Sequence, residues 1–351
     1  MSRPRPLQSA AAPVLAHAPG RGRCDAVLGT PGVESALLLL ALGLGACSAR
    51  VSVGPAGARE PTPTEAPAPV AHPPAAKRAP VPDDVVEQAR APFVGIRSKD
   101  PELLASDALL DELSHADLVC VGEEHANAQS HYAEWVVIEG LAERAAMAGR
   151  DVGVGLEMLS RPQQPVLDAY LRGDLDNGEF EKESAWEEHW GWDFAYYRPQ
   201  LELAKRRGLP LLALNAPRAW TRAVARHGIE GLPPELAKRL PELDLEDADH
   251  RAWFEQTMKD HPHGNPRNVY AAQVVWDETM AESSMRWLGM KLPGRQLVVL
   301  AGSGHCRNDA IPARARRRGQ VKVASVRALS GDASAQRAEL GAFDYALVFE
   351  K

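Results

Sequence analysis

Short runs of aliphatic residues alternate with longer segments of helical apolar spacing from about residue 83 to the end of the chain. The short runs predict buried strands, at residues 118–123, 152–158, 210–215, 297–301, 321–328 and 344–349. The segments between them predict helices, at residues 128–148, 162–171, 201–207, 218–227, 234–240, 247–259, 267–288 and 311–318. Strands separated by helices of this length are typical of a parallel sheet. We therefore predict an α/β domain with a mainly parallel central sheet flanked by helices, over residues 83–351.

One stretch between two predicted strands is too long for a single crossover helix. Residues 217–292 hold several helical patterns and no strand pattern. We expect this insertion to form a helical cap over one end of the sheet.

The segment before the predicted domain resembles an export signal. Two arginines precede the apolar run 36–44, which is too short to span a bilayer and ends in Leu44-Gly-Ala-Cys47. This ending is similar to a bacterial lipobox, in which Cys47 carries the lipid; an ordinary signal peptide with an incidental Cys is the alternative. Residues 48–82 are rich in Ala and Pro and predict an extended tether. We expect a signal peptide over residues 1–47 and a membrane-anchored protein of the cell envelope, at the outer membrane or periplasmic face if the organism is Gram-negative.

The distribution of charge argues against nucleic acid as a partner. The formal net charge is −7, yet residues 1–82 hold eight Arg and Lys against four Asp and Glu, which leaves −11 for the rest. A body this acidic lacks the basic surface that binds phosphates.

Polar side chains follow four of the predicted strands. Glu123 and His125 follow the first, Glu157 and Asn215 follow the next two, and His305 follows the fourth. Because the carboxyl ends of parallel strands share one edge of a sheet, where ligands bind, we expect these residues to form one site. Glutamate and imidazole are common ligands of divalent metals.

The first of these motifs has a structural interpretation of equal weight. Its polar groups would then cap the amides of the following helix, a role that suits Asn127. His131 joins the site if it lies in the first turn of that helix.

An aromatic block lies between the second and third of these strands. Its members are Trp186, Trp190, Trp192, Phe194, Tyr196 and Tyr197. Packing of a helix pair against the sheet is the favoured interpretation. The alternative is a wall for a flat apolar ligand such as a porphyrin, with Tyr or His as an axial iron ligand.

Two cysteines fall within the predicted domain. An exported protein permits oxidation of Cys120 and Cys306. The sequence does not show whether the two Cα atoms lie close enough for a bond. We expect Cys120 to be a buried free thiol, which is the commoner fate of such a residue.

The chain resembles the ChaN-like haem-binding lipoproteins over about residues 95–350. They belong to a superfamily with Tiki-type metalloproteases, TraB-like proteins and erythromycin esterases. Five segments carry the resemblance, in this order: Gly122-Glu-Glu-His-Ala-Asn-Ala-Gln-Ser-His131, Gly155-Leu-Glu-Met-Leu-Ser-Arg-Pro-Gln-Gln164, Trp192-Asp-Phe-Ala-Tyr-Tyr-Arg-Pro199, Leu214-Asn-Ala-Pro-Arg218 and Ala301-Gly-Ser-Gly-His305.

The resemblance implies haem binding through a Tyr phenolate, with haems enclosed when two chains form a homodimer. The corresponding candidates for contact with the cofactor are Tyr197, Tyr196, Arg198 and Asn215.

In the hydrolytic relatives the corresponding polar set holds the catalytic group, which implies metal ligation here by Glu123, His125, Glu157 and His305. Cys306 follows directly and would be a soft ligand.

Two functions remain open. The first is an exported lipoprotein that binds haem or iron and serves in their uptake. The alternative is a metal-dependent hydrolase of esterase or protease type, in which His125 and Glu157 are catalytic.

Overall fold

The computed structural model describes residues 85–88, 90–99, 102–260, 264–290, 294–329 and 340–349. The predicted signal peptide, the lipid-bearing Cys47 and the tether lie outside the described residues. Within those ranges, no helix combines the length and the apolar character needed to cross a membrane.

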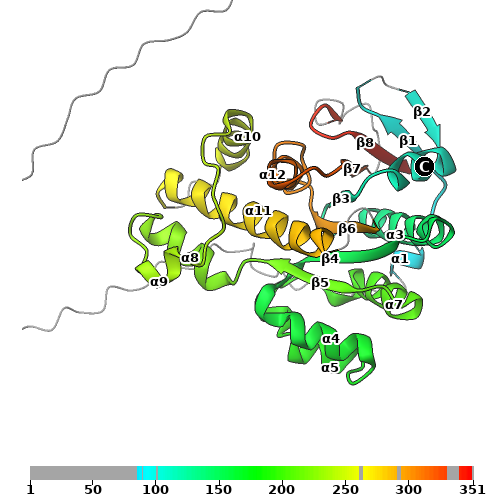
Figure 1. Cartoon of the computed structure of the whole chain (residues 1–351), viewed down its shortest axis with the longest axis horizontal. Helices are drawn as coiled ribbons and strands as arrows, with labels where there is room; N and C mark the ends of the chain where they lie inside the picture. Colours follow the sequence, from blue (N-terminus) through cyan, green and yellow to red (C-terminus); the bar gives the residue numbers. More distant parts are fainter. Residues whose placement is uncertain are drawn as a thin grey trace, which may run out of the picture. The chain divides into compact units, whose positions relative to one another are not determined.

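The domain is built on an eight-stranded sheet (Figure 1). Its order is β2-β1-β8-β7-β3-β6-β4-β5, and the strands are β1 (Phe93–Arg97), β2 (Glu102–Ala105), β3 (Leu118–Glu123), β4 (Asp151–Ser160), β5 (Leu211–Asn215), β6 (Arg295–Gly302), β7 (Val323–Leu329) and β8 (Tyr345–Phe349). From β8 to β5 every neighbouring pair is parallel, whereas β1 is antiparallel to both β2 and β8. The predicted mainly parallel α/β architecture is therefore confirmed.

Helices connect and cover these strands. They are α1 (Val85–Gln88), α2 (Ser106–Ser114), α3 (Ala128–Ala148), α4 (Gln164–Arg172), α5 (Asn177–Glu183), α6 (Trp186–His189), α7 (Arg198–Arg207), α8 (Arg218–His227), α9 (Pro234–Ala237), α10 (Ala248–Met258), α11 (Pro266–Gly289) and α12 (Ile311–Arg318), with 3-10 turns η1 (Arg161–Gln163) and η2 (Phe194–Tyr196). The caps of α3 show how local sequence sets these limits. Asn127 accepts hydrogen bonds from the amides of Gln129 and Ser130, and Gly149 ends the helix at a φ of 65°.

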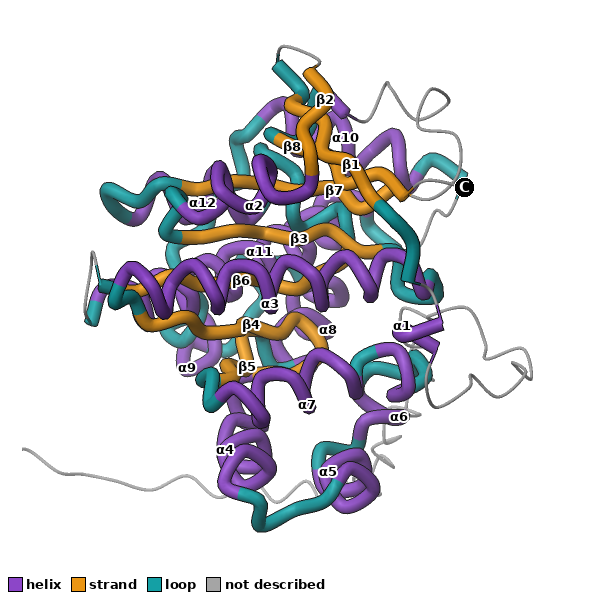
Figure 2. The backbone as a smooth tube through the Cα atoms, turned by 90° about the vertical axis from the view of Figure 1, so that its right-hand side faces the viewer, coloured by secondary structure: helices purple, strands orange, loops and turns teal. Residues whose placement is uncertain are grey.

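The sheet separates two hydrophobic layers. In β3, Val119 and Val121 face the layer formed with α2, α3 and α7, while Leu118 and Cys120 face the layer formed with α11 and α12. Figure 2 shows α2, α3 and α7 on one side of the strands and α11 on the other. Successive strand residues point to opposite faces, and a strand buried on both faces is continuously apolar, as the β3 sequence is.

The insertion between β5 and β6 contributes to the body of the domain. The C-terminal half of α11 packs on the sheet through Met280, Ala281 and Trp287. Its N-terminal half supports α8 and α10, through contacts with Val224 and Phe254. Part of the helical segment 217–292 therefore covers one face of the sheet, and the cap over one end of the sheet stays a prediction.

A disulfide joins Cys120 of β3 to Cys306, with the two Cα atoms 5.3 Å apart across a sequence separation of 186 residues. The expected free thiol at Cys120 was wrong, and a disulfide sulfur at Cys306 is unsuited to act as a thiolate ligand. The contact follows from the parallel pairing of β3 with β6, after which the chain turns back over β3. Gly122 permits the close approach, because a Cβ there would lie 3.0 Å from Ser303 Cα and 3.4 Å from Cys306 Cβ.

Candidate functional site

The carboxyl ends of β3, β6 and β4 lie side by side and bring four of the predicted residues together. In the register of the sheet, Glu123 is opposite Gly302, and β6 is also paired with β4, which carries Glu157. His125 follows β3, and His305 lies in the turn that follows β6. The topology alone therefore places two carboxylates and two imidazoles at one sheet edge.

Glu123 is the buried acceptor of the first pair. His125 Nδ1 lies 2.5 Å from its Oε1, and the hydroxyl of Tyr197 donates to the same oxygen at 2.8 Å. Burial opposes ionisation of Glu123, but the imidazoles of His131 and His125 lower its pKa to about 2. The carboxylate is therefore ionised and orients the His125 ring.

His125 is the part-exposed member of this pair, with 28% of its side chain accessible. Its ring centroid lies 4.9 Å from that of Trp190 and 5.3 Å from that of Trp192. Burial disfavours the charged imidazole, yet the hydrogen bond to Glu123 raises the pKa of His125 overall. A Cβ on Gly302 would lie 2.8 Å from His125 Cε1, so the glycine leaves room for the ring.

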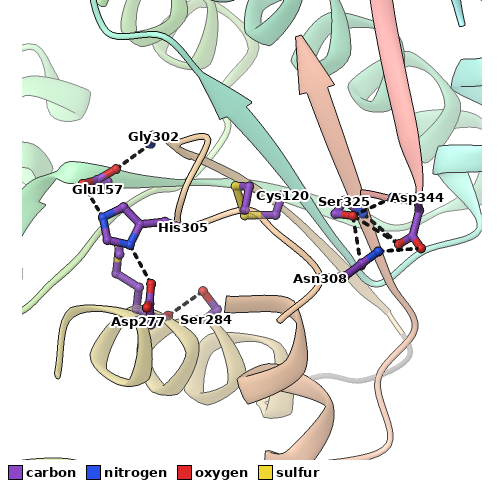
Figure 3. Close-up of a disulfide and its surroundings, with 11 residues drawn as sticks. Cys120, Glu157, Asp277, Ser284, Gly302, His305, Asn308, Ser325 and Asp344 are labelled. Atoms are coloured by element: carbon purple, nitrogen blue, oxygen red, sulfur yellow. Dashed lines mark hydrogen bonds and ion pairs between the residues drawn. A yellow bond between two sulfur atoms is a disulfide. The ribbon is translucent and has the colours of Figure 1, made fainter. Parts of the chain in front are cut away.

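The second polar group at the sheet edge is a chain of three side chains, in which His305 lies between Glu157 and Asp277 (Figure 3). His305 Nε2 lies 3.2 Å from Glu157 Oε1, and His305 Nδ1 lies 2.6 Å from Asp277 Oδ1. The amide of Gly302 donates to Glu157 Oε2 at 2.6 Å. Burial lowers the pKa of His305, but Glu157 and Asp277 raise it well above its usual value. The imidazole is therefore held in its charged form between two carboxylates.

The sequence interpretation missed Asp277, which lies on α11 within a mostly apolar stretch. Its carboxylate is fully buried and also pairs with His250 Nε2 at 3.1 Å. His250 in turn lies 3.2 Å from the hydroxyl of Tyr270 and 3.3 Å from the guanidinium of Arg314. The sequence signal for Asp277 is an acidic residue within the apolar stretch of a predicted helix. A charge buried there is costly unless it has a partner, so a buried partner is expected.

A third polar group lies behind Glu123, inside the protein. His131 Nδ1 is 2.9 Å from Glu134 Oε2, and Gln200 donates to that oxygen at 3.0 Å. Burial lowers the pKa of His131, whereas burial and Glu123 raise the pKa of Glu134 well above its usual value. His131 thus does join the site, as considered from the sequence, while Glu134 and Gln200 were missed.

The residues expected to contact a cofactor occupy different environments. Tyr197 is 1% exposed, and burial together with Glu123 raises the pKa of its phenol well above the ordinary value. Tyr196 is half-buried and stacks on His131 with ring centroids 5.0 Å apart. Asn215 donates to the carbonyl of Glu157 at 2.9 Å, which supports the site, and the Arg198 guanidinium lies 3.8 Å from Glu202.

A hollow of about 330 Å³ lies at the carboxyl ends of β4 and β5. Its lining includes His189, which precedes Trp190, and also Glu188, Arg218 and Arg222. Burial lowers the pKa of Arg218, and the like charge of Arg222 lowers it further. The hollow therefore presents excess positive charge beside the aromatic segment.

These features define an α/β protein with paired imidazoles and carboxylates at its sheet edge and, beside them, an aromatic segment that is largely packed into the core. The chain belongs to the family described as haem-binding uptake, Tiki superfamily, ChaN, whose sequence profile matches residues 109–314. No curated protein matches the chain.

A solved structure with a TM-score above 0.5 supports the fold, and two others are more distant. ChaN of Campylobacter jejuni, described with cofacial haem binding, is 17% identical, with a TM-score of 0.59 over 74% of this chain and 97% of that one. The type III effector HopBA1 is 12% identical, with a TM-score of 0.41 over 70% and 93%. A mutant of the erythromycin esterase EreC is 15% identical, with a TM-score of 0.40 over 68% and 77%.

Proposed function

We propose that this protein is an envelope lipoprotein that binds haem at the aromatic edge of its sheet and serves in haem or iron uptake. Membership of the haem-binding uptake family is the observation that carries the proposal. The likeness in fold to ChaN of Campylobacter jejuni agrees with it.

The site has the groups that a porphyrin requires. The half-buried Trp192 offers aromatic surface next to the part-exposed imidazole of His125, which the buried Trp190 also contacts. Glu123 holds Nδ1 of that imidazole, a carboxylate–histidine arrangement that orients metal-binding histidines in many proteins. His125 and the half-buried Tyr196 are therefore the candidate axial ligands, because both are more accessible than Tyr197, which is 1% exposed.

The positively charged hollow supports a ligand that carries carboxylates. Arg218 and Arg222 are four residues apart on α8, so their like charges repel across one helical turn. An anion between them would relieve that repulsion. Haem has two propionate carboxylates on one edge of the ring, and His189 of the hollow directly precedes Trp190 of the aromatic segment. The hollow is thus placed to hold the acidic edge of the ring.

Hemin titration followed by the Soret band tests haem binding. We expect saturable binding by the purified protein, weakened at least about tenfold when the axial ligand is replaced. Tyr196→Phe and His125→Gln identify that ligand, and Tyr197→Phe is the matched control for Tyr196→Phe. Absence of any Soret shift at stoichiometric hemin would remove the proposal.

The envelope location has its own test. Membrane fractionation after labelling with a radioactive fatty acid should show lipid on the wild type and none on Cys47→Ser. Label retained by the variant would contradict a lipid at Cys47.

Hydrolysis is a second candidate function, favoured by one observation. The pair Glu123–His125 and the chain Glu157–His305–Asp277 both face the sheet edge. Such carboxylate–imidazole pairs suit a general base that activates water. Esterase and peptidase assays on the wild type and His125→Ala test this role. Equal rates in both proteins would exclude it.

A further inference from the structure

Three buried side chains behind the sheet edge converge on one point. Glu123 of β3 and His131 and Glu134 of α3 each supply one ligand atom, and these atoms all lie within 4.8 Å of one another. The side chains of all three residues are fully inaccessible to solvent. His131 Nδ1 is 2.9 Å from Glu134 Oε2 and 3.6 Å from Glu123 Oε2. The part-exposed His125 is bound to Glu123 but is not a member of this buried triad.

The hydrogen bonds of His131 define which ring nitrogen carries a hydrogen. His131 Nε2 lies 3.1 Å from the backbone carbonyl of His125. A carbonyl oxygen only accepts, so Nε2 must carry the hydrogen. In a neutral imidazole Nδ1 is then a bare lone pair, and it faces a carboxylate oxygen that also carries only lone pairs. Either a shared proton or a cation has to lie between these acceptors.

The neighbouring donors bind elsewhere. Tyr197 and His125 both bind Oε1 of Glu123, and Gln200 donates to Oε2 of Glu134. Among the described residues, no other side chain donates to Glu123 Oε2 or Glu134 Oε1, and the two carboxyl groups lie within hydrogen-bonding reach of each other. The ion pairs that these two acids form with described residues are to histidines alone. Two buried carboxylates with unpaired oxygens are costly unless a cation or a shared proton neutralises them.

We propose that Glu123, His131 and Glu134 bind a first-row divalent cation of the Mn²⁺, Fe²⁺ or Zn²⁺ type. Ligand atoms about 2.1 Å from a metal are about 3.0 Å apart at octahedral angles and about 3.4 Å apart at tetrahedral angles. The distances of 2.9 and 3.6 Å from His131 Nδ1 are close to these values. Two carboxylates and one imidazole suit these metals better than a soft ion such as Cu⁺. The triad lies deeper than the part-exposed ring of His125, although the two share Glu123.

Two variants separate this site from the exposed one. Glu134→Gln keeps the shape of a protonated Glu134 but removes a charged ligand of the triad. Glu157→Gln makes the same change in the neighbouring chain of His305 and serves as the matched control. The purified full-length proteins are stripped with EDTA, loaded with Mn²⁺ or Zn²⁺ alone, and desalted. Metal content and the Tm with and without EDTA are then measured.

We expect about one equivalent of metal in the wild type and in Glu157→Gln, and an affinity at least about 100-fold weaker in Glu134→Gln. EDTA should lower the Tm of the first two proteins only. Metal lost from Glu157→Gln but kept by Glu134→Gln would overturn the proposal in favour of the sheet edge. A wild type that takes up no metal would also overturn it, and a shared proton between the two acids would then explain the triad.

If Glu134→Gln fails to fold, X-ray absorption spectroscopy of the wild type loaded with Mn²⁺ or Zn²⁺ tests the proposal, because it counts the imidazole ligands of the metal. The triad supplies one imidazole to the metal, whereas a site that joins His125 and His305 supplies two. One imidazole in the first coordination sphere supports the proposal, and two overturn it.

Discussion

Removal of the Cys120–Cys306 disulfide should destabilise the domain strongly. The bond closes a loop with a sequence separation of 186 residues. The chain-entropy relation assigns about 5 kcal/mol at 25 °C to a loop of this length, and native disulfides commonly contribute about 2–5 kcal/mol. We therefore expect the double variant Cys120→Ala/Cys306→Ala to lose about 2–5 kcal/mol of its free energy of unfolding. Because Cys306 follows His305, the variant should also weaken ligand binding at the sheet edge.

Urea unfolding followed by tryptophan fluorescence measures this loss, with oxidised and reduced wild type beside the double variant. Reductant should lower the unfolding midpoint of the wild type and leave that of the variant unchanged, which controls for effects of reductant elsewhere. A difference below about 1 kcal/mol between oxidised wild type and variant would refute the reasoning, since it would mean that the loop closure contributes little.

Three further results are expected. Gly302→Ala should cost about 1–3 kcal/mol of stability in urea unfolding and weaken hemin binding, because its Cβ would lie 2.8 Å from His125 Cε1; unchanged hemin affinity would contradict the contact. The pKa of His305 is raised well above 6.5 in the folded protein, so its stabilising contribution is fully present below pH 6.5 and is lost as the pH rises through the folded pKa. Urea midpoints of the metal-free, haem-free protein should accordingly fall from pH 6.5 upward, and His305→Gln should flatten that slope. Finally, Arg222→Gln should weaken hemin binding by about tenfold but leave hemin dimethyl ester unaffected, with Arg226→Gln, one turn along α8, as the control; equal losses for both ligands would argue against a carboxylate in the hollow.

Much of the fold follows from local sequence patterns. The predicted limits of β3, α3, α8 and α12 agree with the structure residue for residue. Each of these elements has a clear apolar run or a helical pattern with a definite end, such as Asn127 before α3 and Gly228 after α8. The antiparallel edge was not predicted, because β1 and β2 are short, β1 is mostly half-buried and β2 mostly exposed, and neither has a long continuous apolar run.

The sequence predicted those site residues that lie at the ends of strands. Glu123, Glu157 and His305 each follow a recognisable strand, so the parallel topology was enough to bring them together. Asp277 and Glu134 lie on helices, and their positions depend on which helix face meets the sheet edge. The Cys120–Cys306 bond likewise depends on the register of β3 with β6. The two cysteines are 186 residues apart, so no local sequence pattern reveals that register.

Two consecutive acids on α11 bind different partners. Asp277 binds His305 of the site, while Glu278 pairs with Arg314, Arg317 and Arg318 of α12. These ion pairs therefore fix the rotational setting of α11 against the segment 305–318. As a result the segment 217–292 is no detachable module. A truncated chain that joined β5 directly to β6 would strip one sheet face and leave the imidazole of His305 without its orienting acid.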